Sequence, residues 1–287
     1  MTVSGGTTTP AARFGVLRRL GSNLAAWLAI LLRPGTVPLQ PLWPPPPKTM
    51  ACAVALLLLF AGAMFALDGW MNEQALRRSP DWLRAFFDAV TEFGKSGWLL
   101  WPLGILLFLI AASPSDKLSR VSQGVLAALA VRLSYVFIAV AVSGLFTSLV
   151  KRMIGRSRPF LSLIRGEADP YLFMPFAWKD PYTSLPSGHA TNVFAAAIAI
   201  GAVWPQARWV MWVYAAVIAA SRVMLAAHFP SDVVGGAIVG TVGALLVRRW
   251  FAARRLGFTV RADGSIRSLT APPSRRIKKV AAGLLSQ

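Results

Sequence analysis

The sequence predicts an all-α protein, a polytopic membrane helix bundle with six transmembrane helices and short interfacial helices. Three observations predict it. Hydrophobic residues make up 55% of the 287 residues and charged residues only 14%, whereas a soluble domain carries about 25% charge. Six apolar runs approach the roughly 20 residues that a spanning helix needs. Most of the net charge of +19 lies at the two ends of the chain, which is typical of membrane topology and argues against nucleic acid as a partner.

The N-terminal residues 1–49 carry five cations and no acid. An apolar run from Leu24 to Leu32 is too short to span a bilayer. Arg33 and Pro34 follow it in place of a small-residue cleavage site, which favours an interfacial helix over a signal peptide. Seven prolines between residues 34 and 47 predict a stiff linker. We therefore expect residues 1–49 to form a cytoplasmic segment that precedes the membrane domain.

Residues 50–250 are expected to form the six-helix membrane domain. Arg132 lies near one end of the third run, where its long side chain can reach the lipid headgroups. The fourth and sixth runs are rich in Ala and Gly, which favours close helix packing inside the bundle. The predicted spans lie at about residues 50–67, 96–113, 124–150, 188–204, 209–227 and 232–250.

A shorter helix is expected between the first two spans. Ser79 can cap its start, Pro80 suits its first position and Gly94 can end it. Its apolar side chains recur at helical spacing, which predicts one face turned toward the membrane or the bundle. Packing against the bundle is the simpler role, and a lip around a lipid entrance is the alternative. The stripe consists of Leu83, Phe86, Phe87 and Val90.

Counting Lys and Arg on the two sides of six spans indicates the topology. The side that holds both termini receives 18 of these residues and the other side 11. The positive-inside rule then places both termini, including the basic tail at 251–287, in the cytoplasm. The segment 151–187 falls on the external side although it carries six cations and three acids. A bound anion would explain this cationic external segment.

The residues that can do chemistry lie at the same external ends. The chain has two histidines, His189 and His228, and Asp232 follows His228 by four residues. A neutral imidazole can attack phosphorus, a carboxylate can orient it, and a second imidazole can protonate the leaving oxygen. Arg and Lys side chains bind phosphate oxygens, and so do backbone N–H groups at a helix N-terminus. The candidate anion site consists of Lys151, Arg158, Arg222 and the backbone of Ser187, Gly188 and His189.

Three segments resemble the signature blocks of the type 2 phosphatidic acid phosphatase superfamily. They are KRMIGRSRP at 151–159, PSGH at 186–189 and SRVMLAAHFPSD at 221–232. The resemblance implies that His228 is the nucleophile that becomes a phosphohistidine, that Asp232 orients it, and that His189 is the general acid and later base. It also implies a phosphate-binding set of Lys151, Arg158, Ser187, Gly188 and Arg222. Arg152 and Arg156 lie outside the signature positions and are assigned to topology or headgroup charge.

We therefore expect a lipid phosphatase of the bacterial inner membrane with its active site facing the periplasm. No metal and no cofactor are required, and the partners are the bilayer and a lipid phosphate. Phosphatidic acid, phosphatidylglycerol phosphate, undecaprenyl (pyro)phosphate and a lipid A phosphate all fit the mechanism. Lys179 and Asp180 are further candidates for substrate contact. The alternatives are a vanadium haloperoxidase-like enzyme, which shares the signature blocks, and a transporter or channel. The sequence does not indicate an oligomeric state.

Overall fold

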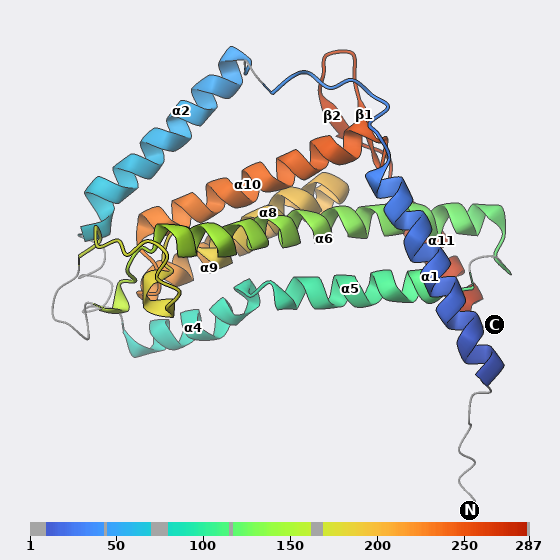
Figure 1. Cartoon of the computed structure of the whole chain (residues 1–287), viewed down its shortest axis with the longest axis horizontal. Coiled ribbons are helices and arrows are strands. Elements are labelled where there is room, and N and C mark those ends of the chain that lie inside the picture. The colour runs from blue at the N-terminus through green and yellow to red at the C-terminus, as the bar shows by residue number, and fades with distance from the viewer. Residues whose placement is uncertain (1–9, 43–44, 70–79, 115–116, 162–168, 286–287) are drawn as a thin grey trace, which may run out of the picture.

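The computed structural model describes residues 10–42, 45–69, 80–114, 117–161 and 169–285, which are mostly helical (Figure 1). Each of the six apolar runs forms a helix. The first, α2, continues into a short π-helix, η1. These helices are α2 (Pro47–Gly62), η1 (Ala63–Leu67), α5 (Gly97–Ala112), α6 (Arg120–Ile154), α8 (Gly188–Val203), α9 (Arg208–Met224) and α10 (Pro230–Ala253).

The predicted count of six transmembrane helices is not confirmed. Within the described residues, four helical stretches are long and apolar enough to cross a membrane: Pro47–Leu67, Asp81–Ala112, Arg120–Ile154 and Pro230–Ala253. The helix α8 has only 16 residues, which is about 24 Å at a rise of 1.5 Å per residue. A hydrocarbon core is about 30 Å thick. The helix α9 has 17 residues and is similarly short.

The helix α8 lies at the centre of the bundle, where it packs against α6, α9 and α10. Small residues allow this close approach. A side chain at Gly240 on α10 would place its Cβ 2.3 Å from the Thr191 carbonyl oxygen of α8, and one at Gly236 would lie 2.4 Å from the Ser187 carbonyl oxygen. The Ala- and Gly-rich composition of the two runs thus serves helix contact, as the sequence predicted. The fully or almost fully buried alanines of α8 are Ala190, Ala195, Ala196, Ala197 and Ala199.

The N-terminal helix α1 (Pro10–Leu32) crosses the bundle end opposite α4 (Figure 1). It is longer than the predicted apolar run, and Asn23 Nδ2 ties it to the Ala111 carbonyl oxygen at 2.7 Å. The backbone N–H groups of Thr36 and Val37 both donate to the Ala253 carbonyl oxygen, at 2.7 and 3.0 Å. The linker is therefore fixed to the end of α10. The placement of α1 in the interface stays a prediction.

The short helix α4 (Asp81–Thr91) begins after Pro80 and continues into a 3₁₀ turn, η2 (Glu92–Gly94). Ser79, the predicted cap, lies outside the described residues. The helix packs against α9, and Val90 contacts the cluster of buried residues around Ile218. Tyr214 of α9 donates its hydroxyl to the Phe93 carbonyl oxygen at 2.6 Å. Packing against the bundle, the simpler of the two predicted roles, is what the structure shows.

The C-terminal segment is folded, which the sequence did not predict. It forms an antiparallel pair of strands, β1 (Phe258–Val260) and β2 (Ile266–Ser268), followed by α11 (Ser274–Leu285). Phe258 belongs to the main hydrophobic core. The expectation that Arg132 reaches the headgroups is wrong. Arg132 is buried and donates from Nη2 to the carbonyl oxygens of Leu269 and Thr270, at 2.8 and 2.9 Å.

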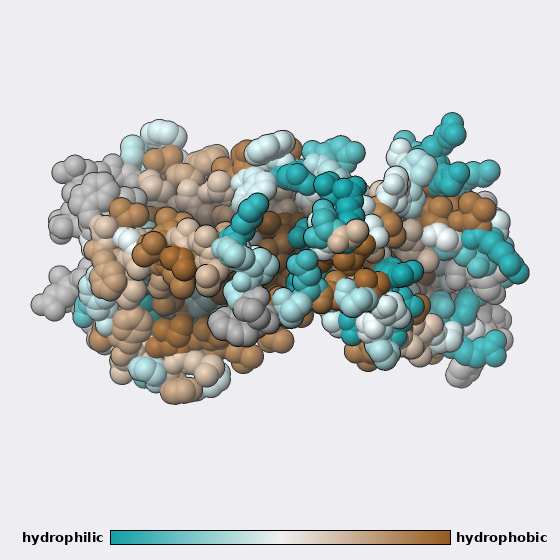
Figure 2. Space-filling view, turned by 90° about the horizontal axis from the view of Figure 1, so that it is seen from above, coloured by the Kyte–Doolittle hydropathy of each residue, from teal (hydrophilic) through white to brown (hydrophobic). Residues whose placement is uncertain are grey.

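The surface of the molecule differs between its two halves. Figure 2 shows hydrophobic residues gathered over the half that holds α2 and hydrophilic residues gathered over the half that holds the β-hairpin and α1. The cations of α11 contribute to the hydrophilic half, because Arg275, Arg276, Lys278 and Lys279 are all exposed. This polarity agrees with a chain whose basic end lies outside the hydrocarbon.

Candidate active site

The predicted site residues come from four helix ends at the end of the bundle where α4 and η1 also lie (Figure 1). Lys151 is in the last turn of α6, which Gly155 ends with a left-handed φ of 68°. A side chain at Gly155 would place its Cβ 1.8 Å from the Met174 carbonyl oxygen, so only glycine fits there. Gly188 and His189 begin α8, Arg222 lies in the last turn of α9, and Pro230 begins α10 two residues before Asp232.

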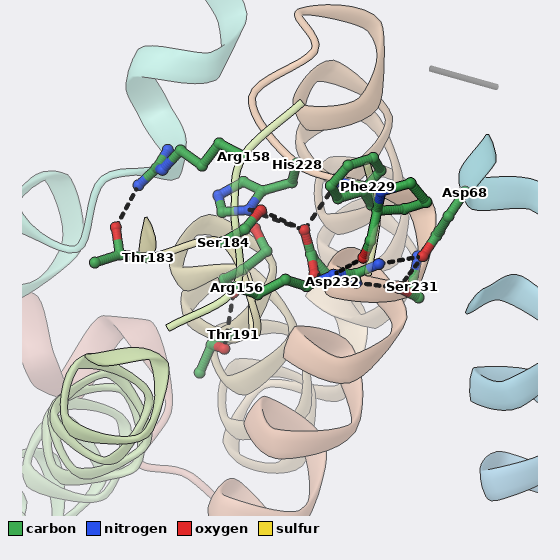
Figure 3. A network of polar contacts seen from close by, with 12 residues as sticks. Asp68, Arg156, Arg158, Thr183, Ser184, Thr191, His228, Phe229, Ser231 and Asp232 are labelled. Carbon is green, nitrogen blue, oxygen red and sulfur yellow. Dashed lines mark hydrogen bonds and ion pairs between the residues drawn. The ribbon is translucent and has the colours of Figure 1, made fainter. Parts of the chain in front are cut away.

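The two catalytic candidates His228 and Asp232 lie side by side (Figure 3). His228 occupies the turn between α9 and α10, and its Nδ1 lies 3.7 Å from Asp232 Oδ2. Ser184 lies against both residues: its hydroxyl donates to Asp232 Oδ2 at 2.5 Å and is 3.4 Å from His228 Nδ1. The Phe229 N–H also donates to Asp232 Oδ2, at 2.9 Å. The carboxylate is thus held in a fixed orientation toward the imidazole.

The His228 imidazole is almost completely buried. Burial, together with the charges of Arg158 and Arg222, lowers the pKa of His228 to about 4, although the Asp232 carboxylate works in the opposite direction. The imidazole is therefore neutral at pH 7. A neutral ring with a free electron pair is the state in which histidine can attack phosphorus.

Two arginines of the predicted phosphate-binding set are fixed by neighbouring groups. Arg158 donates from Nε to the Asp180 carbonyl oxygen and from Nη2 to Thr183 Oγ1, both at 3.1 Å. Arg222 donates from Nη1 to Thr91 Oγ1 at 2.6 Å, so the end of α4 orients it. Burial lowers the pKa of the Arg158 guanidinium, but a guanidinium stays protonated in proteins. Lys151 lies within electrostatic reach of Arg158.

The start of α8 and the end of α9 offer polar atoms that other groups do not use. Ser187 Oγ, His189 Nε2 and Arg222 Nε are buried and have no hydrogen-bond partner among the described residues. Ser187 makes no side-chain cap hydrogen bond, so a role as a helix cap does not account for its hydroxyl. One part of the prediction is wrong: the Ser187 N–H donates to the Asp232 carbonyl oxygen at 2.9 Å. The N–H groups of Gly188 and His189 remain for an anion.

The sequence missed several residues that hold these groups in place. Arg156, assigned to topology or headgroup charge, is fully buried and forms ion pairs with Asp68 and Asp232. That assignment is wrong. Asp68 was visible in the sequence as a lone acid at the end of an apolar run, which is a signal for a partner. Two further candidates for substrate contact lie nearby. Asp180 accepts a hydrogen bond from Arg158 through its backbone carbonyl oxygen. Lys179 directly precedes the short 3₁₀ turn Asp180–Tyr182.

A groove leads from the polar site along the bundle. Near the start of α8, a 230 Å³ cavity is lined by residues of α5, α6 and α8, including Gly188 and Asn192. A second, 570 Å³ cavity follows α5 from Ser96 to Phe108 and is lined mainly by apolar side chains. The two share Ser96 and Leu100. From Ser96 to Phe108 the groove follows a helical rise of about 18 Å.

Comparisons with known proteins show the family of this chain. The model of the PAP2 superfamily matches residues 132–256. A lipid A 1-phosphatase of Rhizobium johnstonii is 32% identical over 222 residues, covering 77% of this chain and 88% of that protein. A lipid A 1-phosphatase of Rhizobium etli is also 32% identical, covering 77% and 92%. The crystal structure of a transmembrane PAP2 type phosphatidylglycerolphosphate phosphatase from Bacillus subtilis has a TM-score of 0.46 and 22% identity, covering 69% of this chain and 94% of that one.

Proposed function

This chain belongs to the PAP2 superfamily and is a membrane lipid phosphatase that acts on phosphate monoesters, and from this premise we propose which residues do the chemistry and which lipid is the substrate. The observation that carries the mechanism is the meeting of His228, His189 and Arg222 at one bundle end, where Ser187 Oγ, His189 Nε2 and Arg222 Nε are buried without a hydrogen-bond partner among the described residues.

In the proposed mechanism, His228 forms a bond to the substrate phosphorus while the bond from phosphorus to the lipid oxygen breaks. His189 gives its proton to that oxygen, and the lipid alcohol leaves. His189 then takes a proton from water, whose oxygen bonds to phosphorus while the bond from His228 to phosphorus breaks. This step releases inorganic phosphate and restores the neutral imidazole. Asp232 orients the His228 ring and stabilises the positive charge that develops on it. Lys151, Arg158 and Arg222 balance the charge of the phosphate oxygens, so no step requires a metal.

The proposed substrate is a lipid A-type saccharolipid that carries a 1-phosphate. Two relatives named as lipid A 1-phosphatases support this choice, because they match this chain over about nine tenths of their own length. The groove along α5 supports a lipid substrate in general. Its apolar part can hold an acyl chain while the phosphate stays at the polar end.

We place the enzyme in the bacterial inner membrane with both termini in the cytoplasm and the active site facing the periplasm. The distribution of Lys and Arg supports this orientation. The basic hairpin and α11 lie at the end of the bundle opposite the turn between α9 and α10 (Figure 1), which holds His228. The basic segment and the site therefore face different sides. Oligomeric state is not part of the proposal.

The test is phosphate release by the purified, detergent-solubilised protein on a substrate panel. The panel contains lipid A 1-phosphate, phosphatidic acid, phosphatidylglycerol phosphate and undecaprenyl pyrophosphate, with His228→Ala as the inactive control. We expect the highest kcat/KM on lipid A 1-phosphate, activity that persists in excess chelator, and inhibition by orthovanadate, which mimics the transition state. A higher kcat/KM on another lipid would overturn the substrate, and loss of activity in chelator with recovery in magnesium would overturn the mechanism.

A further inference from the structure

Behind Asp232 lies a second buried carboxylate that the mechanism above does not use. Asp68, at the end of η1, is fully buried. Its Oδ1 accepts the Ser231 N–H at 2.9 Å, and its Oδ2 accepts the Ser231 hydroxyl at 2.5 Å. Both contacts are made at the start of α10, where a helix N-terminus favours negative charge. Asp68 thus ties the first apolar helix to the helix that carries Asp232.

Arg156 connects the two carboxylates (Figure 3). Its Nη2 donates to Asp68 Oδ2 and its Nη1 to Asp232 Oδ1, both at 2.7 Å. Nη1 also donates to Ser231 Oγ at 2.6 Å, and Nε donates to the Pro170 carbonyl oxygen at 2.9 Å. The guanidinium lies over the ring of Phe229 at 4.6 Å. Its geometry is therefore fixed from several sides, and it is out of reach of solvent.

The balance of charge in this cluster is informative. One guanidinium faces two carboxylates, so the three side chains together carry one negative charge. If Arg156 had Asp232 as its only partner, the pair would be neutral and would do little for a cation on His228. With Asp68 present, one negative charge remains beside the imidazole. That charge becomes useful when His228 is phosphorylated and its ring carries a positive charge.

We propose that Asp68 and Arg156 are positioning residues of the phosphatase: Arg156 fixes Asp232, and Asp68 balances Arg156 so that Asp232 keeps its charge for His228. This inference rests on the proposed roles of His228 and Asp232. It assigns a catalytic purpose to the first apolar helix, which otherwise leans away from the bundle (Figure 1).

The other charges around His228 lie on different elements and stay unchanged in the test. Arg222 is on α9, His189 is on α8, and Arg158 is in the segment that follows α6. A change at Asp68 therefore alters one charge of the surroundings while these groups and Asp232 remain.

The experiment compares Asp68→Asn with the double variant Asp68→Asn, Arg156→Gln. The single variant makes the cluster neutral, and the double variant restores one negative charge on Asp232. We expect kcat/KM of Asp68→Asn to fall about tenfold at pH 7 and the acid limb of its pH profile to move down by about one pH unit, the order expected for one charge in a protein interior. In the double variant the acid limb should return to the wild-type pH.

The matched control is Asp81→Asn, which removes an exposed carboxylate at the start of α4 and should leave both quantities unchanged. Gel filtration and thermal denaturation in detergent establish that each variant is folded. If Asp68 and Arg156 only stabilise the fold, kcat/KM of the double variant should be at least as low as that of the single variant, and the acid limb of the pH profile should not move. That outcome, or wild-type kinetics in folded Asp68→Asn, would overturn the inference.

Failure of the proposed mechanism gives a different result. If His228→Ala keeps its activity, the catalytic assignment itself is wrong. If His228→Ala is inactive while Asp68→Asn behaves like the wild type, the assignment stands and only the role of Asp68 and Arg156 is lost.

Discussion

His228 combines two requirements that oppose each other. In the proposed mechanism it is a nucleophile that must be neutral before the reaction, and then a phosphohistidine that must carry a positive charge. Burial and the nearby guanidiniums favour the neutral ring. Asp232, 3.7 Å away, favours the charged ring. The site therefore keeps the imidazole neutral at pH 7 and keeps a carboxylate in place for the proposed intermediate.

The pH profile should report this environment. Because burial lowers the pKa of His228 to about 4, the neutral nucleophile persists as the pH falls below the ordinary value of about 6.5. We expect kcat/KM, corrected for the second ionisation of the substrate phosphate near pH 6, to fall only below about pH 4. The unfolded chain binds this proton at higher pH, so folding stability should decline as the pH falls from about 6.5 to 4. An acid limb near pH 6.5 after correction would contradict the buried, neutral His228.

The two histidines should differ in how their loss depends on the leaving group. His228→Ala removes the nucleophile and should form no phosphoenzyme with any substrate. His189→Ala removes only the proton donor, which a nitrophenolate does not need and a lipid alkoxide does. General acid–base catalysis contributes about 10²–10⁴-fold, so the defect of His189→Ala should be smaller on an aryl phosphate by about that factor. Burst kinetics with nitrophenyl phosphate measure the defect on the aryl substrate, and phosphate release measures the defect on the lipid substrate. Equal loss on both substrates in folded protein would mean that the roles are wrong.

At the scale of elements, the site is an assembly of helix ends set by small residues. Gly236 and Gly240 bring α10 against the backbone of α8, and this contact fixes Asp232 relative to His189. At the end of η2, a side chain on Gly94 would place its Cβ 2.6 Å from His189 Cδ2. The positions of catalytic side chains thus depend on residues that have no side chain themselves.

Gly240→Ala tests the packing of α8 against α10. The added Cβ would lie 2.3 Å from the Thr191 carbonyl oxygen, and overpacking of this kind costs about 1–3 kcal/mol. We expect a lower melting temperature in detergent together with reduced kcat. The matched control is Gly124→Ala on α6, where a Cβ meets nothing within 4 Å and the better helix propensity of alanine applies. Equal melting temperatures for the two variants would show that the contact between α8 and α10 is not tight.

At the scale of the whole molecule, the chain has two chemically different ends. One end holds His228 and the buried charges, and the other holds α1, the β-hairpin and the cations of α11 (Figure 1). The groove along α5 begins at the catalytic end and continues into the apolar part of the bundle. The proposed function uses this arrangement: the lipid stays in the bilayer while its phosphate is hydrolysed at the catalytic end.

Cysteine labelling in intact cells tests the orientation. In a Cys52→Ser background, Trp178→Cys introduces a thiol at a side chain that is 71% exposed on the catalytic side, and Arg261→Cys introduces one at the exposed turn of the hairpin. A maleimide that does not cross the inner membrane should label position 178 in intact cells. It should label position 261 only after the inner membrane has been permeabilised. The opposite pattern would place the active site in the cytoplasm and exclude periplasmic lipid substrates.

The sequence by itself determined the membrane class, the positions of the helices and the candidates for catalysis. Apolar length and Lys/Arg distribution are local properties of the chain, and the signature blocks keep fixed spacings, so His189, His228 and Asp232 could be identified without a structure. It also placed the site residues at one end of the bundle, because each lies at the end of an apolar run.

Only the tertiary structure decided what surrounds these residues. Asp68 and Arg156 are 88 residues apart, and Arg132 meets Leu269 across 137 residues, so no local pattern could pair them. Sequence reasoning assigned Arg132 to the headgroups and Arg156 to topology or headgroup charge, and it gave Asp68 no role. Burial reverses that expectation, because a buried charge must find a partner or carbonyl oxygens, and the fold alone decides which of them lie within reach.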